Sequence, residues 1–130
     1  MKIYYEPINL LEWNMFKKIS GIGHIEGLLA TKSMECGDII LLHAGKQNRK
    51  YKSGIYSIGE IVTAPFIFNE QIDCHCYNRL TVNVKIIKMN YTTPIISYEE
   101  FQRFNKQFRT VHLIEEQYYD EIINLINREN

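Results

Sequence analysis

Two strands and the loop that joins them are encoded in GDIILLHAGKQNRKYKSGIYSIGEIVTAP, from Gly37 to Pro65. Residues 39–44 and 54–62 are runs of Ile, Leu, Val and Tyr bounded by Gly, Ser or Pro, which is the pattern of buried strands. Residues 45–53 between them are too polar to be buried. The sequence therefore predicts a β-hairpin or two neighbouring strands.

The second of these strands carries two small residues, Ser57 and Gly59, on one face. A strand face without large side chains often marks a close approach by another group. We interpret this gap, together with His43 and Ala44 on the first strand, as the floor of a pocket. His43 also has a purely structural interpretation, as a hydrogen-bonded histidine at a strand end.

The loop between the strands is basic, and no acidic residue occurs between Asp38 and Glu60. Lysine and arginine side chains on such a loop can hold the phosphates of a nucleic acid, and Tyr51 offers a ring on which a base could stack. The alternative is an ordinary soluble hairpin tip, since basic clusters are common on surfaces. The candidate phosphate-binding cations are Lys46, Arg49, Lys50 and Lys52.

The same region resembles the EVE domains of the PUA-like superfamily. The resemblance is carried by Gly37-Asp38 with the following aliphatic strand and by GIYSIGEI at residues 54–61, and it continues through NRLTVNV at 78–84 and RTVHL at 109–113. It covers most of the chain from Met34 onward and includes no catalytic sequence motif. It implies a PUA-like fold and binding of a flipped, modified base, commonly a modified cytosine, in a pocket with aromatic walls.

A flipped base needs rings to sandwich it and polar groups to read its edge. The candidate rings are Tyr4, Tyr5, Trp13, Tyr56 and Tyr77, although most aromatic residues of a small domain are core. Asn9 is a candidate edge reader because an amide both donates and accepts hydrogen bonds, but it also suits a helix cap.

The rest of the chain predicts further short elements. We expect a strand over 2–6 that ends at Pro7, helices over 9–18 and 25–33, a strand over 79–89 with a bulge near Ile86, a helix capped by Ser97, a strand over 108–113 and a helix over 115–128. This order predicts an α+β fold, with a PUA-like curled, mixed and mostly antiparallel sheet or small barrel flanked by short helices.

Length and composition limit the possible functions. The 130 residues form one expected domain, 1–130, and a formal net charge of zero argues against strong non-specific nucleic-acid binding. Neither a signal peptide nor an apolar run of membrane-spanning length is visible, so we expect a cytoplasmic protein that does not contact membranes. An odd count of 3 cysteines favours reduced thiols. The triplet Cys74-His75-Cys76 lacks the spacing of a structural zinc site, so no metal or cofactor is expected.

The sequence therefore favours a non-enzymatic module that binds DNA or RNA carrying a modified base. Such a module could act as the sensor of a modification-dependent defence system, with a separate nuclease or effector chain as partner. Two alternatives stay open. One is an ASCH-type amidohydrolase acting on modified nucleosides, with Lys46 and Glu60 in catalytic roles, and the other is a protein-interaction module.

Overall fold

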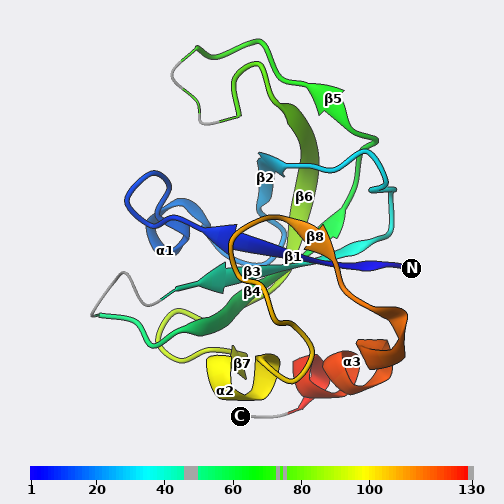
Figure 1. Cartoon of the computed structure of the whole chain (residues 1–130). Coiled ribbons are helices and arrows are strands. Elements are labelled where there is room, and N and C mark those ends of the chain that lie inside the picture. Colours follow the sequence, from blue (N-terminus) through cyan, green and yellow to red (C-terminus); the bar gives the residue numbers. More distant parts are fainter. Residues whose placement is uncertain (46–49, 73, 75, 129–130) are drawn as a thin grey trace.

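The structure is a computed structural model that describes residues 1–45, 50–72, 74 and 76–128. Its centre is a mixed sheet with the strand order β2-β6-β4-β3-β1-β8 (Figure 1). The short β5 pairs with β6, and β7 pairs with β4. The strands are β1 (Ile3–Ile8), β2 (Ile25–Leu29), β3 (Ile39–Ala44), β4 (Gly54–Ile61), β5 (Phe66–Ile67), β6 (Leu80–Met89), β7 (Ile96–Ser97) and β8 (His112–Leu113).

The hairpin expected from the sequence forms the middle of this sheet. β3 and β4 pair antiparallel from Ile39 opposite Glu60 to Ala44 opposite Gly54. β1 pairs parallel with β3, and the other pairs are antiparallel. The prediction of a mixed, mostly antiparallel sheet is therefore confirmed.

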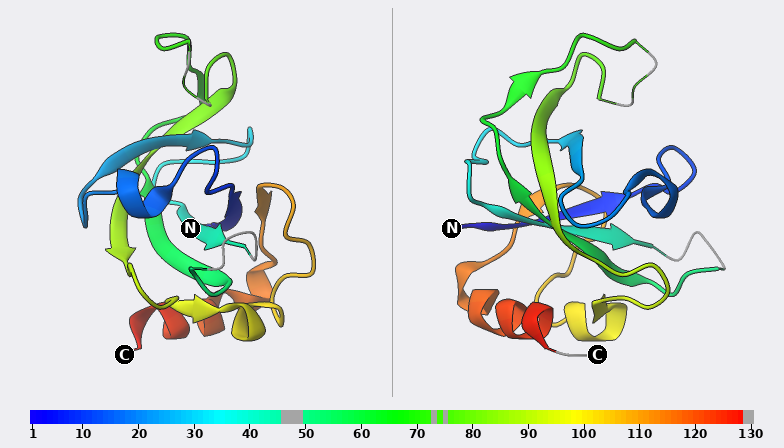
Figure 2. Two further views of the ribbon diagram at one scale, coloured as in Figure 1. Left: turned by 90° about the vertical axis from the view of Figure 1, so that its left-hand side faces the viewer. Right: turned by 180° about the vertical axis from the view of Figure 1, so that it is seen from behind.

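Short helices cover the sheet. They are α1 (Met15–Lys18), α2 (Tyr98–Phe101) and α3 (Tyr119–Asn127), with a 3-10 turn at Glu116–Tyr118 before α3. Figures 1 and 2 show α2 and α3 together on one side of the sheet and α1 away from them.

Two apolar clusters lie on the two faces of the sheet, because side chains alternate along a strand. Tyr4, Trp13 and Tyr56 belong to the cluster that also contains Met15 of α1. Tyr5 belongs to the other cluster, which also contains residues of α2 and α3. β1 thus contributes to both cores.

The bulge expected near Ile86 is present. Ile58 lies opposite Lys88 while Gly59 lies opposite Ile86, so the pairing of β4 with β6 shifts between Ile58 and Gly59. The extra residue on β6 increases the local twist and curls the sheet.

Two helix predictions were wrong. Residues 10–12 form a turn, and the helix begins only at Met15, where the Asn14 side chain accepts a hydrogen bond from the Phe16 amide. Residues 25–29 form β2, which pairs with β6. Their three apolar residues fit a helical spacing, but so short a pattern does not separate a helix from a strand, and pairing with β6 decided the outcome.

The ends of other elements also differ from expectation. β1 continues through Pro7 because β8 pairs only with Tyr4 and Tyr5, so no hydrogen bond of the sheet is lost at the proline. The last strand, β8, is likewise shorter than expected, because only His112 and Leu113 pair with β1. Ser97 caps α2 as expected, in a reciprocal capping box with Glu100.

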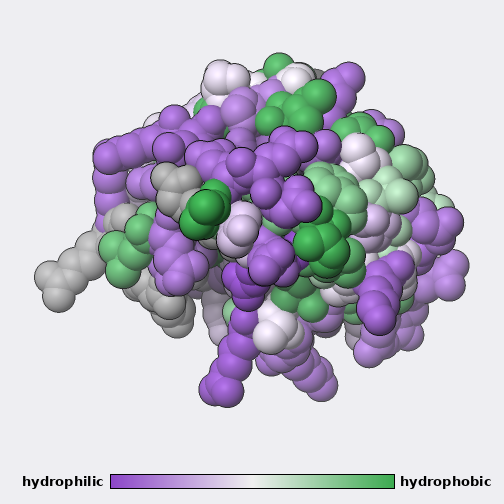
Figure 3. Space-filling view, turned by 90° about the horizontal axis from the view of Figure 1, so that it is seen from above, coloured by the Kyte–Doolittle hydropathy of each residue, from purple (hydrophilic) through white to green (hydrophobic). Residues whose placement is uncertain are grey.

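Within the described residues, no helix is long and apolar enough to span a membrane. Figure 3 shows a largely hydrophilic surface with separate apolar patches on the face seen from above.

Candidate nucleic-acid interface

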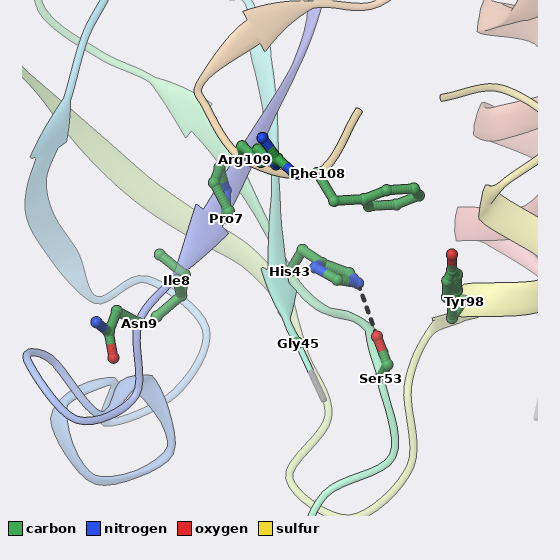
Figure 4. Close-up of a pocket in the computed structure, with 9 residues that line it drawn as sticks. All are labelled: Pro7, Ile8, Asn9, His43, Gly45, Ser53, Tyr98, Phe108 and Arg109. Atoms are coloured by element: carbon green, nitrogen blue, oxygen red, sulfur yellow. Dashed lines mark hydrogen bonds between the residues drawn. The ribbon is translucent and has the colours of Figure 1, made fainter. Parts of the chain in front are cut away.

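A cleft of about 540 Å³ opens where β1 and β3 end, beside Gly45 and Ser53 (Figure 4). We call it the His43 cleft. Figure 4 shows Tyr98 and Phe108 on one side of His43 and residues 7–9 on the other. It is lined by Pro7, Ile8, Asn9, His43, Gly45, Ser53, Tyr98, Phe108 and Arg109.

His43 is buried and both of its ring nitrogens have partners. Nδ1 lies 2.9 Å from the Tyr5 hydroxyl, and Nε2 lies 3.1 Å from Oγ of Ser53. Burial lowers the pKa of His43 to about 4, so the ring is neutral at physiological pH. The cleft therefore contains a fixed, uncharged imidazole.

Aromatic rings form the opposite wall of this cleft. The centroids of Tyr98 and Phe108 lie 5.1 Å apart, and Phe108 also packs edge-on against Tyr5 at 5.6 Å. Both Tyr98 and Phe108 are half-buried, so part of each ring faces the cleft. Such rings can pack against a planar ligand.

A second cleft of about 450 Å³ shares residues 7–9 and Arg109 with the first. We call it the Glu6 cleft. Its walls are mostly apolar, and its ionisable residues are Glu6, Glu12, Arg79 and Arg109. The apolar and small lining residues include Trp13, Leu29, Ala30, Leu80 and Val111.

Glu6 is the unusual residue of this cleft. It is 3% exposed, and no described residue hydrogen bonds to its Oε1. Burial raises the pKa of the Glu6 carboxyl well above its ordinary value. A buried carboxyl oxygen without a hydrogen-bonding partner is rare and calls for an explanation.

The structure describes two of the four cations expected to bind phosphate, Lys50 and Lys52, and both come shortly before Ser53 of the His43 cleft. Lys50 and Lys52 are exposed, and Lys52 directly precedes Ser53 of the cleft. Lys46 and Arg49 lie outside the described residues. Arg109 is exposed and borders both clefts.

Tyr51 is less available for stacking than expected. Its ring stacks on Phe16 with a centroid distance of 3.8 Å and an interplanar angle of 8°. One face of the ring is therefore already covered by the protein.

The interpretation of Ser57 and Gly59 as a pocket floor was wrong. Ser57 is fully buried, and a Cβ on Gly59 would lie 2.1 Å from Cγ1 of Val84 and 3.2 Å from Cγ2 of Ile40. The glycine is needed because β6 packs closely against it at the bulge. The gap seen in the sequence is filled by core side chains, and neither Ser57 nor Gly59 lines the His43 cleft or the Glu6 cleft.

Two more pocket candidates are core residues. Ala44 and Tyr56 are fully buried, and the Tyr56 hydroxyl donates to the backbone oxygen of Lys52 at 2.6 Å. His43, Asn9 and Trp13 do line the clefts, although the Asn9 side chain also accepts a hydrogen bond from the Leu11 amide at 3.0 Å.

The two residues considered for amidohydrolase chemistry are Lys46 and Glu60, and the structure describes only Glu60. Glu60 lies opposite Ile39, at the far end of the β3–β4 ladder from His43, and does not line either cleft. Lys46 is outside the described residues.

Sequence reasoning missed Glu6, Tyr98, Phe108 and Arg109 as site residues. Two signals pointed to them. Arg109 begins one of the segments that carry the EVE resemblance, and Glu6 is an acid in an otherwise apolar strand. Tyr98 and Phe108 gave no signal, because only the fold brings them to His43.

Cys36, Cys74 and Cys76 form no disulfide. Cys76 is buried, and its thiol donates to the backbone oxygen of Gly27 at 3.5 Å. Among the residues that the structure describes, no three metal-binding side chains gather.

The sequence matches no family model and no curated protein significantly. Solved structures do resemble the chain. Human THYN1 in complex with DNA containing 5-methylcytosine is 12% identical, with 100% of each chain covered and a TM-score of 0.64. PSPTO5229 from Pseudomonas syringae is 11% identical, with 95% of this chain and 99% of that chain covered and a TM-score of 0.65.

An ASCH protein from Zymomonas mobilis is also similar, at 11% identity and a TM-score of 0.57, with 95% of each chain covered. At these identities the likeness establishes the fold alone. The fold implied by the sequence resemblance is confirmed: the chain has a PUA-like fold, which EVE-type and ASCH proteins share.

Proposed function

We propose that this chain is a non-enzymatic module that binds nucleic acid and holds a modified, flipped base in the paired clefts. The observation that carries the proposal is the combination, at one end of the sheet, of two joined clefts with a basic rim. Clefts of this size, mostly apolar with few polar groups, are typical of small-molecule sites. A base must leave its stack to enter such a cleft.

The rim suits the phosphate backbone. Arg109 borders both clefts, and Lys50 and Lys52 come just before Ser53, which lines the His43 cleft. Exposed cations of this kind position a nucleic acid without reading its sequence. Because the whole chain has a net charge of zero, electrostatic attraction to phosphates has to come from a local cluster of this kind.

A modified cytosine in DNA is the first candidate ligand. THYN1, which has a similar fold, was solved with DNA containing 5-methylcytosine. The role that we propose is recognition, with cleavage or signalling left to a separate nuclease or effector chain.

A binding screen tests this proposal. The protein is titrated at low salt against DNA and RNA oligonucleotides that carry different modified bases, with unmodified strands of the same sequence. We expect tighter binding to one class of modified base. Arg109→Ala should weaken binding severalfold, whereas Arg103→Ala, which removes an exposed arginine paired with Glu121 at 3.7 Å, should not.

Three outcomes would overturn the proposal. The first is absence of binding to every oligonucleotide, and the second is equal binding of modified and unmodified strands. The third is turnover of acylated or alkylated nucleosides, which would instead support an ASCH-type amidohydrolase.

A further inference from the structure

Glu6 is placed by β1 at the floor of the Glu6 cleft. β1 alternates between the two cores, with Tyr4 in one and Tyr5 in the other, so Glu6 faces the same side as Tyr4 and Trp13. On β3 its neighbour in the parallel register is Leu42, which is apolar. No ion pair to Glu6 is recorded in the described part of the chain.

A buried carboxyl oxygen without a partner, such as Oε1 of Glu6, costs stability, because its hydrogen bonds to water are lost and not replaced. An apolar residue at position 6 would fill the site without this cost. The residue is thus poorly explained by folding alone, and it lies where a ligand can reach it.

We infer that Glu6 reads the hydrogen-bonding edge of the bound base as a neutral carboxylic acid, donating from its hydroxyl and accepting at its carbonyl oxygen. This inference rests on the proposed function and specifies the ligand within it. The base must present an acceptor next to a donor, as cytosine does with N3 and its N4 amino group. Guanine, which presents two neighbouring donors, would instead suit an ionised carboxylate.

The remaining walls of the cleft agree with this assignment. Trp13 can cover one face of a base, while Leu29, Ala30 and Val111 offer apolar contacts to a methyl group. Arg79 and Arg109 also line this cleft. Burial nevertheless has the largest effect on the pKa of the Glu6 carboxyl, and it raises that pKa.

The ionisable groups around Glu6 decide how binding should depend on pH. They are Tyr4 on β1, Glu12 in the turn after β1, Cys76 and Arg79 before β6, and Arg109 before β8. Burial raises the pKa of the Cys76 thiol to about 12, so it stays neutral in the range tested. Loss of affinity between pH 6 and pH 9 that depends on Glu6 would therefore report its own ionisation.

Three variants test the inference with one probe, a DNA duplex carrying a single 5-methylcytosine. Glu6→Leu removes both hydrogen bonds and should lower affinity about tenfold or more. Glu6→Gln keeps a donor and an acceptor without a titrating proton, so it should restore most of the affinity and abolish the pH dependence of the wild type. Glu99→Gln, an exposed carboxyl on α2, should leave the pH profile of the wild type unchanged.

The wild type should bind more weakly wherever a rise in pH removes the proton from Glu6, because the neutral acid is then lost. The inference is contradicted if Glu6→Leu binds as well as the wild type, if Glu6→Gln loses binding like Glu6→Leu, or if affinity rises with pH. If the wild type itself binds none of the modified oligonucleotides, the proposed function fails, and the inference fails with it.

Discussion

The Tyr5 hydroxyl lies 2.9 Å from Nδ1 of His43 and joins β1 to β3 beside the His43 cleft. Both residues are buried, so water cannot replace this hydrogen bond. Tyr5→Phe should lower the free energy of unfolding by about 1–2 kcal/mol, measured by urea denaturation. Tyr4→Phe is the matched control, because the Tyr4 hydroxyl pairs with the exposed Ser33 and should cost less. An equal cost for the two variants would contradict this account of Tyr5.

His43 should make the protein less stable in mild acid. Burial lowers its pKa to about 4 in the folded state, so the unfolded chain takes up a proton first as the pH falls below about 6.5. The His43 contribution is therefore fully present above pH 6.5 and lost as the pH approaches 4, an effect on the order of 3 kcal/mol. His43→Gln should remove this part of the pH dependence of Tm. Titration of the His43 imidazole itself near pH 6.5, in an assigned NMR titration of the native protein, would refute the prediction.

Gly59 and Val84 should be strongly coupled. Gly59→Ala places a methyl group 2.1 Å from the Val84 side chain, so it should destabilise the fold by about 1–3 kcal/mol through overpacking. Val84→Ala makes room for that methyl group. The double variant should therefore be more stable than the sum of the single effects indicates, as a double-mutant cycle would show. Strict additivity would mean that the two sites do not touch.

The basic loop should contribute to the salt dependence of nucleic-acid binding. Each phosphate contact adds about 0.9 to the slope of log affinity against log salt for duplex DNA, so loss of the loop cations should reduce the slope by about three to four. The test compares Lys46, Arg49, Lys50 and Lys52 changed together to Ala with a control in which Lys32, Lys85, Arg103 and Lys106 are changed together to Ala. Equal slopes for both variants would remove the loop from the interface.

The sequence predicted the parts of the fold that have strong local signals. The hairpin 39–61 has two long apolar strands, Ser97 has a capping partner three residues later, and the reversed alternation after Ile86 indicates the bulge. Residues 25–29 have too few apolar positions to distinguish a strand from a helix. There the pairing with β6 determined the structure, and no local pattern contains that information.

The site was harder to predict because it is assembled from distant segments. Gly59 correctly indicated that another group packs closely against the backbone of β4. That group is the Val84 side chain of the core and not a ligand. His43 was placed correctly at a strand end, whereas Tyr98, Phe108 and Arg109 reach the cleft only through the folding of the C-terminal third. A single sequence does not show such convergence.

The central claim, that the chain distinguishes a modified base, is tested most directly by one competition measurement. Two DNA duplexes of identical sequence, one carrying a single 5-methylcytosine and the other cytosine at that position, compete for the wild-type protein at fixed salt and pH. The account predicts a clear preference for the methylated duplex, because only its base fills the apolar wall formed by Leu29, Ala30 and Val111. Equal binding of the two duplexes would contradict it.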